Sequence, residues 1–288
     1  MTTRSFLVGA YASMPTNLAE QERYYELLAG QEWITGLEIP YPGQLADPQT
    51  RNWLSPHIAK FPDSIITAIP GTMVNVWADD IFGLASPSEQ GRARALAFTK
   101  EIYQIATTLN VSTIAVHSAP TAHCDAATFE ESMKEILKWG DKTIIIEHCD
   151  SATPHHTPEK GFLSLEEELA VAEKVGVQVS INWGRSAIDG RSEHTPIEHI
   201  TAAQNRGLLA GVIFSGASDR ETSYGPAWGD GHLPSSIHEP ASLLNPTAIS
   251  AAAKTAGEIS FLGAKVCVPP TATLEDRLAM LRVIYDAT

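Results

Sequence analysis

The chain has 288 residues, and its 34 acidic against 20 basic side chains give a formal net charge of -14. A surface this acidic repels phosphate backbones, so nucleic acid is not an expected partner. The apolar runs fall short of the about 18 residues that cross a membrane, no signal-peptide core is present, and three irregularly spaced cysteines indicate no disulfide framework, so we expect a cytoplasmic protein without membrane contact.

Short apolar segments recur along the chain, and each is followed by a helical pattern. Strands that are buried on both faces read as near-continuous apolar runs, which is typical of a parallel sheet. The eight segments of this kind are 5–11, 33–41, 64–70, 112–120, 143–150, 177–183, 209–216 and 261–268. This alternation predicts a single closed (β/α)8 TIM barrel over residues 1–288. An open doubly wound sheet is the weaker alternative, because no G-x-G-x-x-G motif follows the first segment.

Helix starts between these segments carry capping patterns. "SPSE" (86–89) and "TPIE" (195–198) each combine a cap residue, a proline at the first helical position and a glutamate at the third. "SLEE" (164–167) and "TLED" (273–276) are further capping-box candidates.

Two connections are long for a barrel, at 70–86 and at 215–242. Ordinary connections have about 4–6 residues, so longer ones are usually functional or disordered. The tryptophan and tyrosine in the second connection favour a lid over disorder. We therefore expect residues 215–242 to cover the C-terminal mouth of the barrel.

Polar residues stand where most of the predicted strands end. The active site of a (β/α)8 barrel lies at the C-terminal ends of its strands. A buried charge there needs a partner or a shifted pKa, so these residues should meet around one polar pocket. The residues concerned are Glu38, His117, Glu147, Asn182, Arg185 and Lys265.

Four of these regions resemble parts of the xylose isomerase-like barrel superfamily, which contains sugar isomerases, ketose 3-epimerases, inosose dehydratases and endonuclease IV. The matching segments are "GLEIPY", "AVHSAP", "IIIEHCD" and "WGDGHLP". In those enzymes one divalent ion is typically held by a Glu after strand 5, an Asp after strand 6, a His after strand 7 and a Glu after strand 8. The resemblance aligns these ligands with Glu147, Asn182, Ser215 and Lys265. The family's D-x-x-H motif becomes Asn182-Trp-Gly-Arg185.

These departures change the charge that the resemblance implies. One anion, Glu147, remains against the two cations Arg185 and Lys265, so we expect no divalent metal and no other cofactor. Lysine would lie where the metal's charge lies in the family, and Glu147 is the expected ligand if a metal is present. The excess positive charge predicts an anionic substrate such as a sugar acid or sugar phosphate, which Arg185 can bind bidentately.

The resemblance implies a sugar isomerase- or epimerase-like enzyme that moves a proton beside a carbonyl. Glu147, Glu38 and Lys265 are the candidate catalytic residues. The candidate substrate-binding residues are His117, Asn182, Arg185, Trp183 and His232. Each has a structural alternative: Glu147 can be an ion-pair partner of Lys265, His117 a hydrogen-bonded strand residue, Trp183 a packing residue and His232 part of a surface turn.

Two other functions stay open beside this one. Lys265 can act as a Schiff-base lysine in an aldolase-like enzyme if neighbouring charge lowers its pKa. The chain can also be a degenerate barrel that binds a sugar acid without turnover. With any of these functions the chain can form oligomers. A zinc site built from "AHCDAAT" (122–128), "EHCDSAT" (147–153) and "PHH" (154–156) is weaker, because neighbouring His and Cys side chains point opposite ways.

Overall fold

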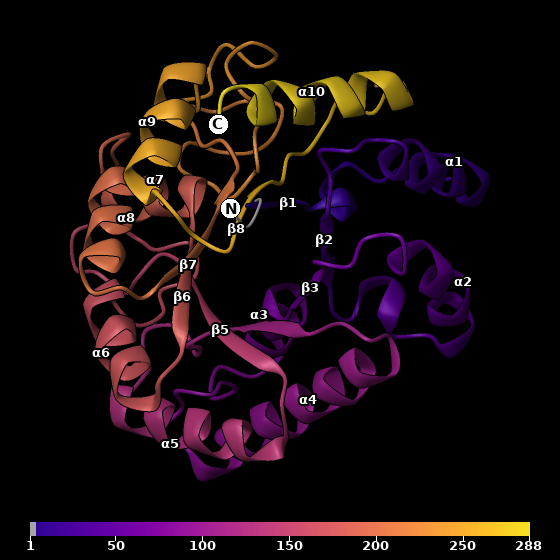
Figure 1. Ribbon diagram of the computed structural model, residues 1–288. Helices are drawn as coiled ribbons and strands as arrows, with labels where there is room; N and C mark the ends of the chain where they lie inside the picture. The colour runs from indigo at the N-terminus through magenta and orange to yellow at the C-terminus, as the bar shows by residue number, and fades with distance from the viewer. Residues whose placement is uncertain (1–3) are drawn as a thin grey trace.

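Eight parallel strands close into one barrel in the computed structural model, which describes residues 4–288 (Figure 1). The strands pair in chain order, and β1 closes the barrel by pairing with β8. They are β1 (Ser5–Val8), β2 (Gly36–Pro40), β3 (Ile65–Thr67), β4 (Thr113–Val116), β5 (Thr143–His148), β6 (Gln178–Asn182), β7 (Leu209–Phe214) and β8 (Phe261–Ala264). The predicted (β/α)8 fold is confirmed, and each predicted segment contains one strand that ends earlier than expected.

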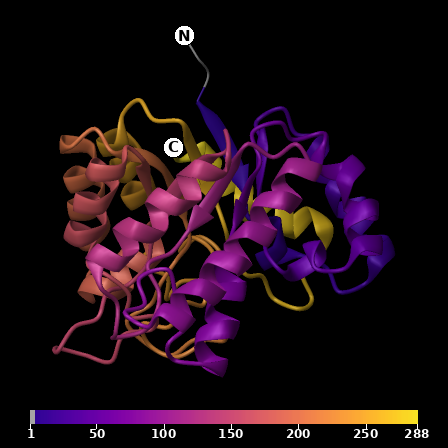
Figure 2. The same ribbon diagram turned by 90° about the horizontal axis from the view of Figure 1, so that it is seen from below.

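A ring of helices surrounds the strands, as Figures 1 and 2 show. The ring helices are α1 (Leu18–Ala29), α2 (Pro48–Ile58), α4 (Glu89–Thr108), α5 (Ala126–Ile136), α6 (Leu165–Val175), α8 (Thr195–Asn205), α9 (Pro246–Ala256) and α10 (Leu274–Asp286). Two more helices, α3 (Ile69–Ala78) and α7 (Trp183–Gly190), follow β3 and β6 almost directly. Short 3-10 segments are η1 (Ala10–Ser13), η2 (Gly43–Leu45) and η3 (Leu137–Trp139). None of the helices in residues 4–288 is long and apolar enough to cross a membrane.

The helix starts confirm two of the four capping predictions. Ser164 and Thr273 each accept from the third helical backbone N–H, and the acidic residue there accepts in return. Helix α4 is instead capped by Ser88, two residues later than expected. Thr195 lies inside α8, whose N-cap His194 makes no side-chain capping bond. Helix α3 occupies the first half of the long connection predicted at 70–86.

The inward-facing residues of the strands form two layers. An apolar layer fills the barrel and contains Leu7, Ile65, Ala115, Ile145, Ala210, Ile213 and Phe261. Side chains alternate between the faces of a strand, so residues two positions later point inward again. In β3, β4 and β5 those residues are Thr67, His117 and Glu147, and all three are buried. The barrel therefore carries a polar layer directly above its apolar plug, toward the C-terminal ends of the strands.

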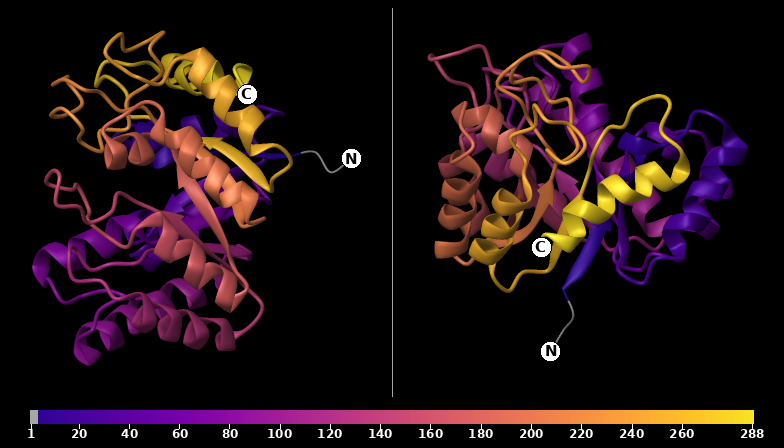
Figure 3. Two further views of the ribbon diagram at one scale, coloured as in Figure 1. Left: turned by 90° about the vertical axis from the view of Figure 1, so that its left-hand side faces the viewer. Right: turned by 90° about the horizontal axis from the view of Figure 1, so that it is seen from above.

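The connection 215–242 contains no helix or strand of its own. Its base is closed by Gly216 and Leu233, whose backbones exchange hydrogen bonds of 2.7 and 3.0 Å. Figure 3 shows this segment at the end of the barrel opposite the start of β1. It lies on the side to which the polar layer belongs.

Candidate active site

Glu147 is the centre of a buried polar network at the C-terminal end of the barrel. Thr67 Oγ1 donates a hydrogen bond of 2.8 Å to its Oε2, and His117 Nε2 lies 2.9 Å from the same oxygen. Arg185 Nη1 donates to Oε1 at 2.6 Å, and Lys265 Nζ lies 3.6 Å from that oxygen. Three strand ends and helix α7 thus bring four partners onto one carboxylate.

Lys265 joins this network to a second carboxylate. Its Nζ donates to Glu38 Oε1 at 2.9 Å, and neither side chain is more than 1% exposed. The ammonium also lies 5.7 Å from the centre of the Tyr11 ring, a cation–π distance. Glu38 Oε2 is buried and has no hydrogen-bond partner among the described residues. One oxygen of Glu38 therefore lacks a hydrogen-bond partner within residues 4–288.

A loop residue that the sequence analysis missed completes the network. Asp230 Oδ2 accepts from Arg185 Nε at 3.1 Å and from Lys160 Nζ at 2.6 Å. His232 Nδ1 lies 3.0 Å from the other oxygen of Asp230. No periodic spacing relates Asp230 or Lys160 to the strand ends, so only the folded chain brings them to Arg185. The 215–242 connection is thereby tied to the site by charge.

The network is balanced in charge. Three cations, Lys160, Arg185 and Lys265, face three carboxylates, Glu38, Glu147 and Asp230. The predicted excess of positive charge is wrong. Glu38 pairs with Lys265, and Asp230 pairs with Arg185 and Lys160. The reason for expecting an anionic ligand disappears with it.

The pKa values of the two central carboxyl groups, Glu147 and Glu38, are shifted in opposite directions. Burial would raise the pKa of Glu147, but Lys265 and Arg185 hold it well below its usual range. Burial also raises the pKa of Glu38, and there it prevails over the opposing effect of Lys265. Neighbouring acids whose environments push their pKa values apart are typical of acid–base sites.

The lysine between them is strongly held in its charged form. Burial would lower the pKa of Lys265, but Glu38 and the other neighbouring acids raise it above its ordinary value. The lowered pKa expected of a Schiff-base lysine is therefore wrong in direction. A permanently protonated amine is a poor nucleophile.

The four positions aligned with family metal ligands do not fit a divalent cation. Lys265 supplies an ammonium, and both oxygens of Glu147 already contact cationic or hydrogen-bonding groups. Asn182 Oδ1 accepts from the Arg185 backbone N–H at 3.1 Å and from Ser215 Oγ at 2.8 Å. A second positive charge placed here would meet Lys265 and Arg185 without a free anionic ligand.

A cavity of about 340 Å³ opens beside this network. Of the predicted site residues, Arg185 and His232 line it. Tyr11 and Arg185, which both line the cavity, contact Lys265 and Glu147 of the network. The lining residues are Tyr11, Ile69, Pro70, Met73, Val74, Trp77, Glu159, Lys160, Arg185, Asp230 and His232. A larger hollow of about 530 Å³ lies at the other end of the barrel and is remote from the ionisable cluster.

Two predicted binding residues have structural positions. Trp183 is completely buried in the core between sheet and helices, because it follows the inward-facing Asn182 and points outward. Its predicted role in binding substrate is therefore wrong. Asn182 caps α7 with its Oδ1, while its Nδ2 has no partner within residues 4–288. Trp77 of α3, which is 76% exposed at the rim of the cavity, is an aromatic residue placed to meet a ligand.

Sequence comparison finds a family over almost the whole chain. The family model described as "Domain of unknown function (DUF4862)" matches residues 7–280. The chain is also 31% identical over 296 residues to uncharacterized protein STM3670 of Salmonella typhimurium strain LT2. That alignment covers 96% of this chain and 94% of the relative.

Structure comparison gives the wider fold group. A xylose isomerase-like TIM barrel/4-hydroxyphenylpyruvate dioxygenase fusion protein matches with a TM-score of 0.67 at 11% identity, over 98% of this chain and 42% of that longer one. A D-tagatose 3-epimerase-like protein matches at 0.64 and 13%, over 99% and 97% of the two chains. An AP endonuclease of family 2 from Brucella melitensis matches at 0.60 and 19%, over 96% of each. The chain thus has the xylose isomerase-like barrel fold.

Proposed function

The chain belongs to the DUF4862 family, and we propose that it is a sugar isomerase- or epimerase-like enzyme that moves a proton beside a carbonyl group. The observation that carries the proposal is the position of Lys265 Nζ, 2.9 Å from Glu38 and 3.6 Å from Glu147. A fixed cation between two carboxylates can do what such chemistry needs of a metal, which is to polarise a carbonyl oxygen. The likeness to an epimerase-like barrel supports the same reaction class.

In this proposal Glu38 transfers the proton. Its Oε2 has no protein partner, and burial raises its pKa toward the range in which a general base works best. Glu147 is held by Thr67, His117 and Arg185, so it acts as a fixed negative charge that positions the two cations. This assignment reverses the order of the two glutamates that the resemblance suggested.

The substrate carbonyl would meet Lys265 and Arg185. Removal of the proton from the adjacent carbon places negative charge on the carbonyl oxygen, and the two cations stabilise it without reorganising. Return of the proton from Glu38 to the neighbouring carbon, with the hydroxyl proton of the carbon that becomes the carbonyl passing to the former carbonyl oxygen, gives an aldose–ketose pair. An epimer forms only when a donor other than Glu38 returns a proton to the first carbon on its opposite face. No step in this sequence requires a divalent metal.

The substrate we propose is a small neutral sugar that carries an aldehyde or ketone. Each cation in the site already has a carboxylate partner. A sugar acid or sugar phosphate would have to replace Asp230 on Arg185 and Lys160. Trp77 at the cavity rim offers the apolar face on which sugar rings pack.

Two rival functions predict different behaviour. A Schiff-base enzyme requires an unprotonated Lys265, which the raised pKa disfavours, and borohydride would trap its substrate on that residue. A barrel that only binds sugars would show saturable binding without any exchange of substrate hydrogens. The opposite pKa shifts of Glu38 and Glu147 favour acid–base catalysis over both rival functions.

Exchange of substrate hydrogen with solvent tests the proposal. Aldoses and ketoses of four to six carbons are incubated with the protein in deuterated water containing a chelator, and nuclear magnetic resonance follows each carbon. We expect deuterium at the carbon beside the carbonyl for at least one sugar, together with its epimer or isomer. Binding of a sugar without deuterium incorporation would refute the enzyme proposal.

A further inference from the structure

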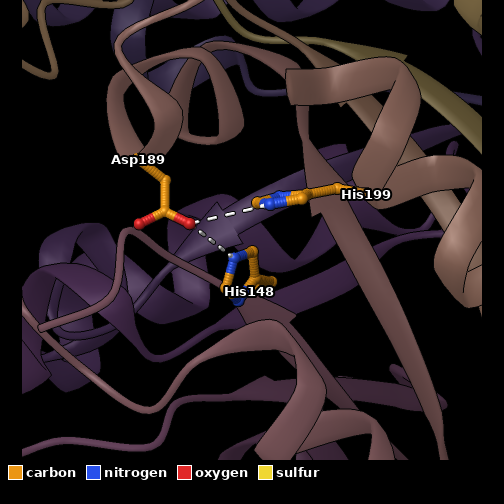
Figure 4. A group of neighbouring side chains, drawn as sticks. All are labelled: His148, Asp189 and His199. Atoms are coloured by element: carbon orange, nitrogen blue, oxygen red, sulfur yellow. Dashed lines mark ion pairs between the residues drawn. The ribbon is translucent and has the colours of Figure 1, made fainter. Parts of the chain in front are cut away.

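A second cluster of ionisable side chains lies outside the barrel wall (Figure 4). It consists of His148 at the end of β5, Asp189 in α7 and His199 in α8. His148 follows the inward-facing Glu147, so strand alternation directs it to the opposite face of the sheet. The cluster is thus separated from the proposed active site by the strand itself.

The spacing inside the cluster is unusual for hydrogen bonds. Asp189 Oδ2 faces the Nε2 atoms of both histidines, at 3.8 Å from His148 and 3.7 Å from His199. Hydrogen bonds of this kind measure about 2.7–3.2 Å. Two ligand atoms that share one tetrahedral ion at about 2.1 Å lie about 3.4 Å apart, so each histidine nitrogen needs to approach Asp189 Oδ2 by only a few tenths of an ångström. All three ligand atoms lie within 4.8 Å of one another.

His148 Nε2 is the strongest sign that something belongs between these atoms. The His148 side chain is completely buried, yet this nitrogen has no hydrogen-bond partner among the described residues. An unpaired buried polar atom is costly unless a ligand satisfies it. The atom points at a carboxylate oxygen that is too distant to be its hydrogen-bond partner.

Glu168 forms a hydrogen bond with one ring nitrogen of His148 and so leaves the other nitrogen without a partner. Its Oε2 lies 2.7 Å from His148 Nδ1, and Ser118 Oγ donates to its other oxygen at 2.5 Å. The carboxylate accepts a hydrogen from Nδ1, which orients the ring so that Nε2 faces Asp189 and would offer its lone pair to an ion that replaces the proton there. Histidines that bind metals are commonly oriented in this way by a carboxylate.

The other two ligands are held from behind in the same manner. Ser151 donates to Asp189 Oδ1 through its backbone N–H at 2.8 Å and its hydroxyl at 2.7 Å. His199 Nδ1 lies 3.0 Å from Ser186 Oγ. The outward atoms of all three residues are therefore engaged, and the three atoms that face one another are not.

We propose that His148, Asp189 and His199 bind one divalent transition-metal ion of the zinc type. Imidazole and carboxylate donors suit such ions, whereas magnesium and calcium prefer oxygen ligands alone. Asp189 and Glu168 place two carboxylates around His148, so a divalent ion can balance the cluster in place of a proton on that histidine. Three protein ligands leave a fourth tetrahedral position for water.

The ion would join β5 to α7 and α8 from outside the barrel, and this inference does not depend on the proposed function. It also differs from the zinc site that the "EHCDSAT" segment suggested. Cys149 Sγ turns toward the active site, 3.7 Å from Arg185 Nη1, so that segment supplies only His148. Asp189 and His199 come from later helices.

Cobalt titration tests the site directly. The full-length protein is freed of metal with a strong chelator and titrated with Co²⁺, while visible absorption reports ions held in four- or five-coordinate geometry. We expect one Co²⁺ per chain, displaced by one equivalent of Zn²⁺, and a midpoint of thermal unfolding raised by about 5 °C or more at saturation. A titration without a saturable visible band would overturn the proposal and leave a proton on His148 as the partner of both carboxylates.

Variants separate this site from adventitious surface binding. His199→Ala and Asp189→Asn remove the two partly exposed ligands, and we expect each to weaken Co²⁺ binding by at least about a hundredfold. His194→Ala removes an exposed histidine near both and should leave the affinity unchanged. Circular dichroism checks the fold of each variant. Full Co²⁺ affinity in folded His199→Ala protein would show that the ion binds elsewhere.

Discussion

Lys265 and Glu38 form a buried ion pair of 2.9 Å, although 227 positions separate them in the chain. The pair closes the polar layer of the barrel between its last and second strands. Glu147 lies on the other side of the same ammonium, at 3.6 Å. The ammonium of Lys265 thus contacts two carboxyl groups whose pKa values are shifted in opposite directions.

Removal of this charge should destabilise the protein. Lys265→Met leaves Glu38 and Glu147 facing each other without a cation between them, which we expect to reduce the free energy of unfolding by about 3–5 kcal/mol. Urea unfolding measures the change. Lys254→Met, at an exposed position of α9, is the control and should change it little. In the double variant Glu38→Gln/Lys265→Met the loss should be partly recovered, and additive losses would contradict the pairing.

A methyl group at position 9 should disturb the same pair without changing any charge. A Cβ on Gly9 would lie 2.8 Å from Lys265 Cβ and 3.0 Å from Glu38 Oε2. We expect Gly9→Ala to cost about 1–3 kcal/mol of stability and to reduce the exchange of substrate hydrogen. At Gly30 an added Cβ meets nothing nearer than 3.5 Å, so Gly30→Ala should be tolerated. Equal behaviour of the two variants would argue against a tightly packed Lys265.

Asp230 should determine whether anions bind. Asp230→Ala frees Arg185 and Lys160 at the cavity wall, so phosphate and sugar acids should bind about ten- to hundredfold more tightly than to the wild type. Isothermal titration calorimetry measures the affinities. Asp219→Ala, at an exposed position of the same loop, is the matched control. Tight phosphate binding by the wild type, unchanged in Asp230→Ala, would mean that Asp230 does not neutralise these cations.

The exchange reaction should depend on pH through Glu38. Because its pKa is raised in the folded protein, the proton-accepting form is populated only above the ordinary glutamate pKa of about 4.3. The rate should therefore rise with pH through the raised pKa and level off above it. In Glu38→Gln this limb should disappear, with a rate loss of about a hundredfold or more. A pH limb that survives in Glu38→Gln would assign the titration to another group.

Trp77 should affect sugar binding but not folding. The side chain is 76% exposed at the cavity rim, so Trp77→Ala should leave the midpoint of thermal unfolding unchanged while raising KM severalfold. Trp77→Phe should restore most of the affinity because an aromatic face remains. A KM that is the same in all three proteins would place the sugar away from α3.

Much of the fold could be predicted from the sequence because a barrel imposes simple periods. Strand runs such as 143–150 are apolar on both faces, and inward positions two residues apart lead directly to Glu147. Alternation also explains why Trp183, next to inward-facing Asn182, turns out to be a core residue. Helix α3 was missed because it begins almost at the end of β3, without a polar cap or a linker to mark it.

The site could be predicted only in part. Residues on strands were found because strand ends gather at one mouth, but the charge balance depends on Asp230 and Lys160, which lie in irregular segments. Counting charges at strand ends alone therefore predicted a positive excess that Asp230 and Glu38 cancel. The cluster of His148, Asp189 and His199 was hidden for the same reason, because three separate elements supply it.

We propose that Lys265 and Glu38 support proton transfer in place of a divalent metal. The most direct measurement is deuterium incorporation beside the carbonyl of the responding sugar, followed for wild type, Glu38→Gln, Lys265→Met and His199→Ala in the presence of a chelator. We expect exchange in wild type and in His199→Ala, and no exchange in Glu38→Gln or in folded Lys265→Met. Two results would contradict this proposal. One is exchange that is absent in chelator-treated His199→Ala and appears only when a divalent metal is supplied in excess of the chelator. The other is exchange that persists in Glu38→Gln.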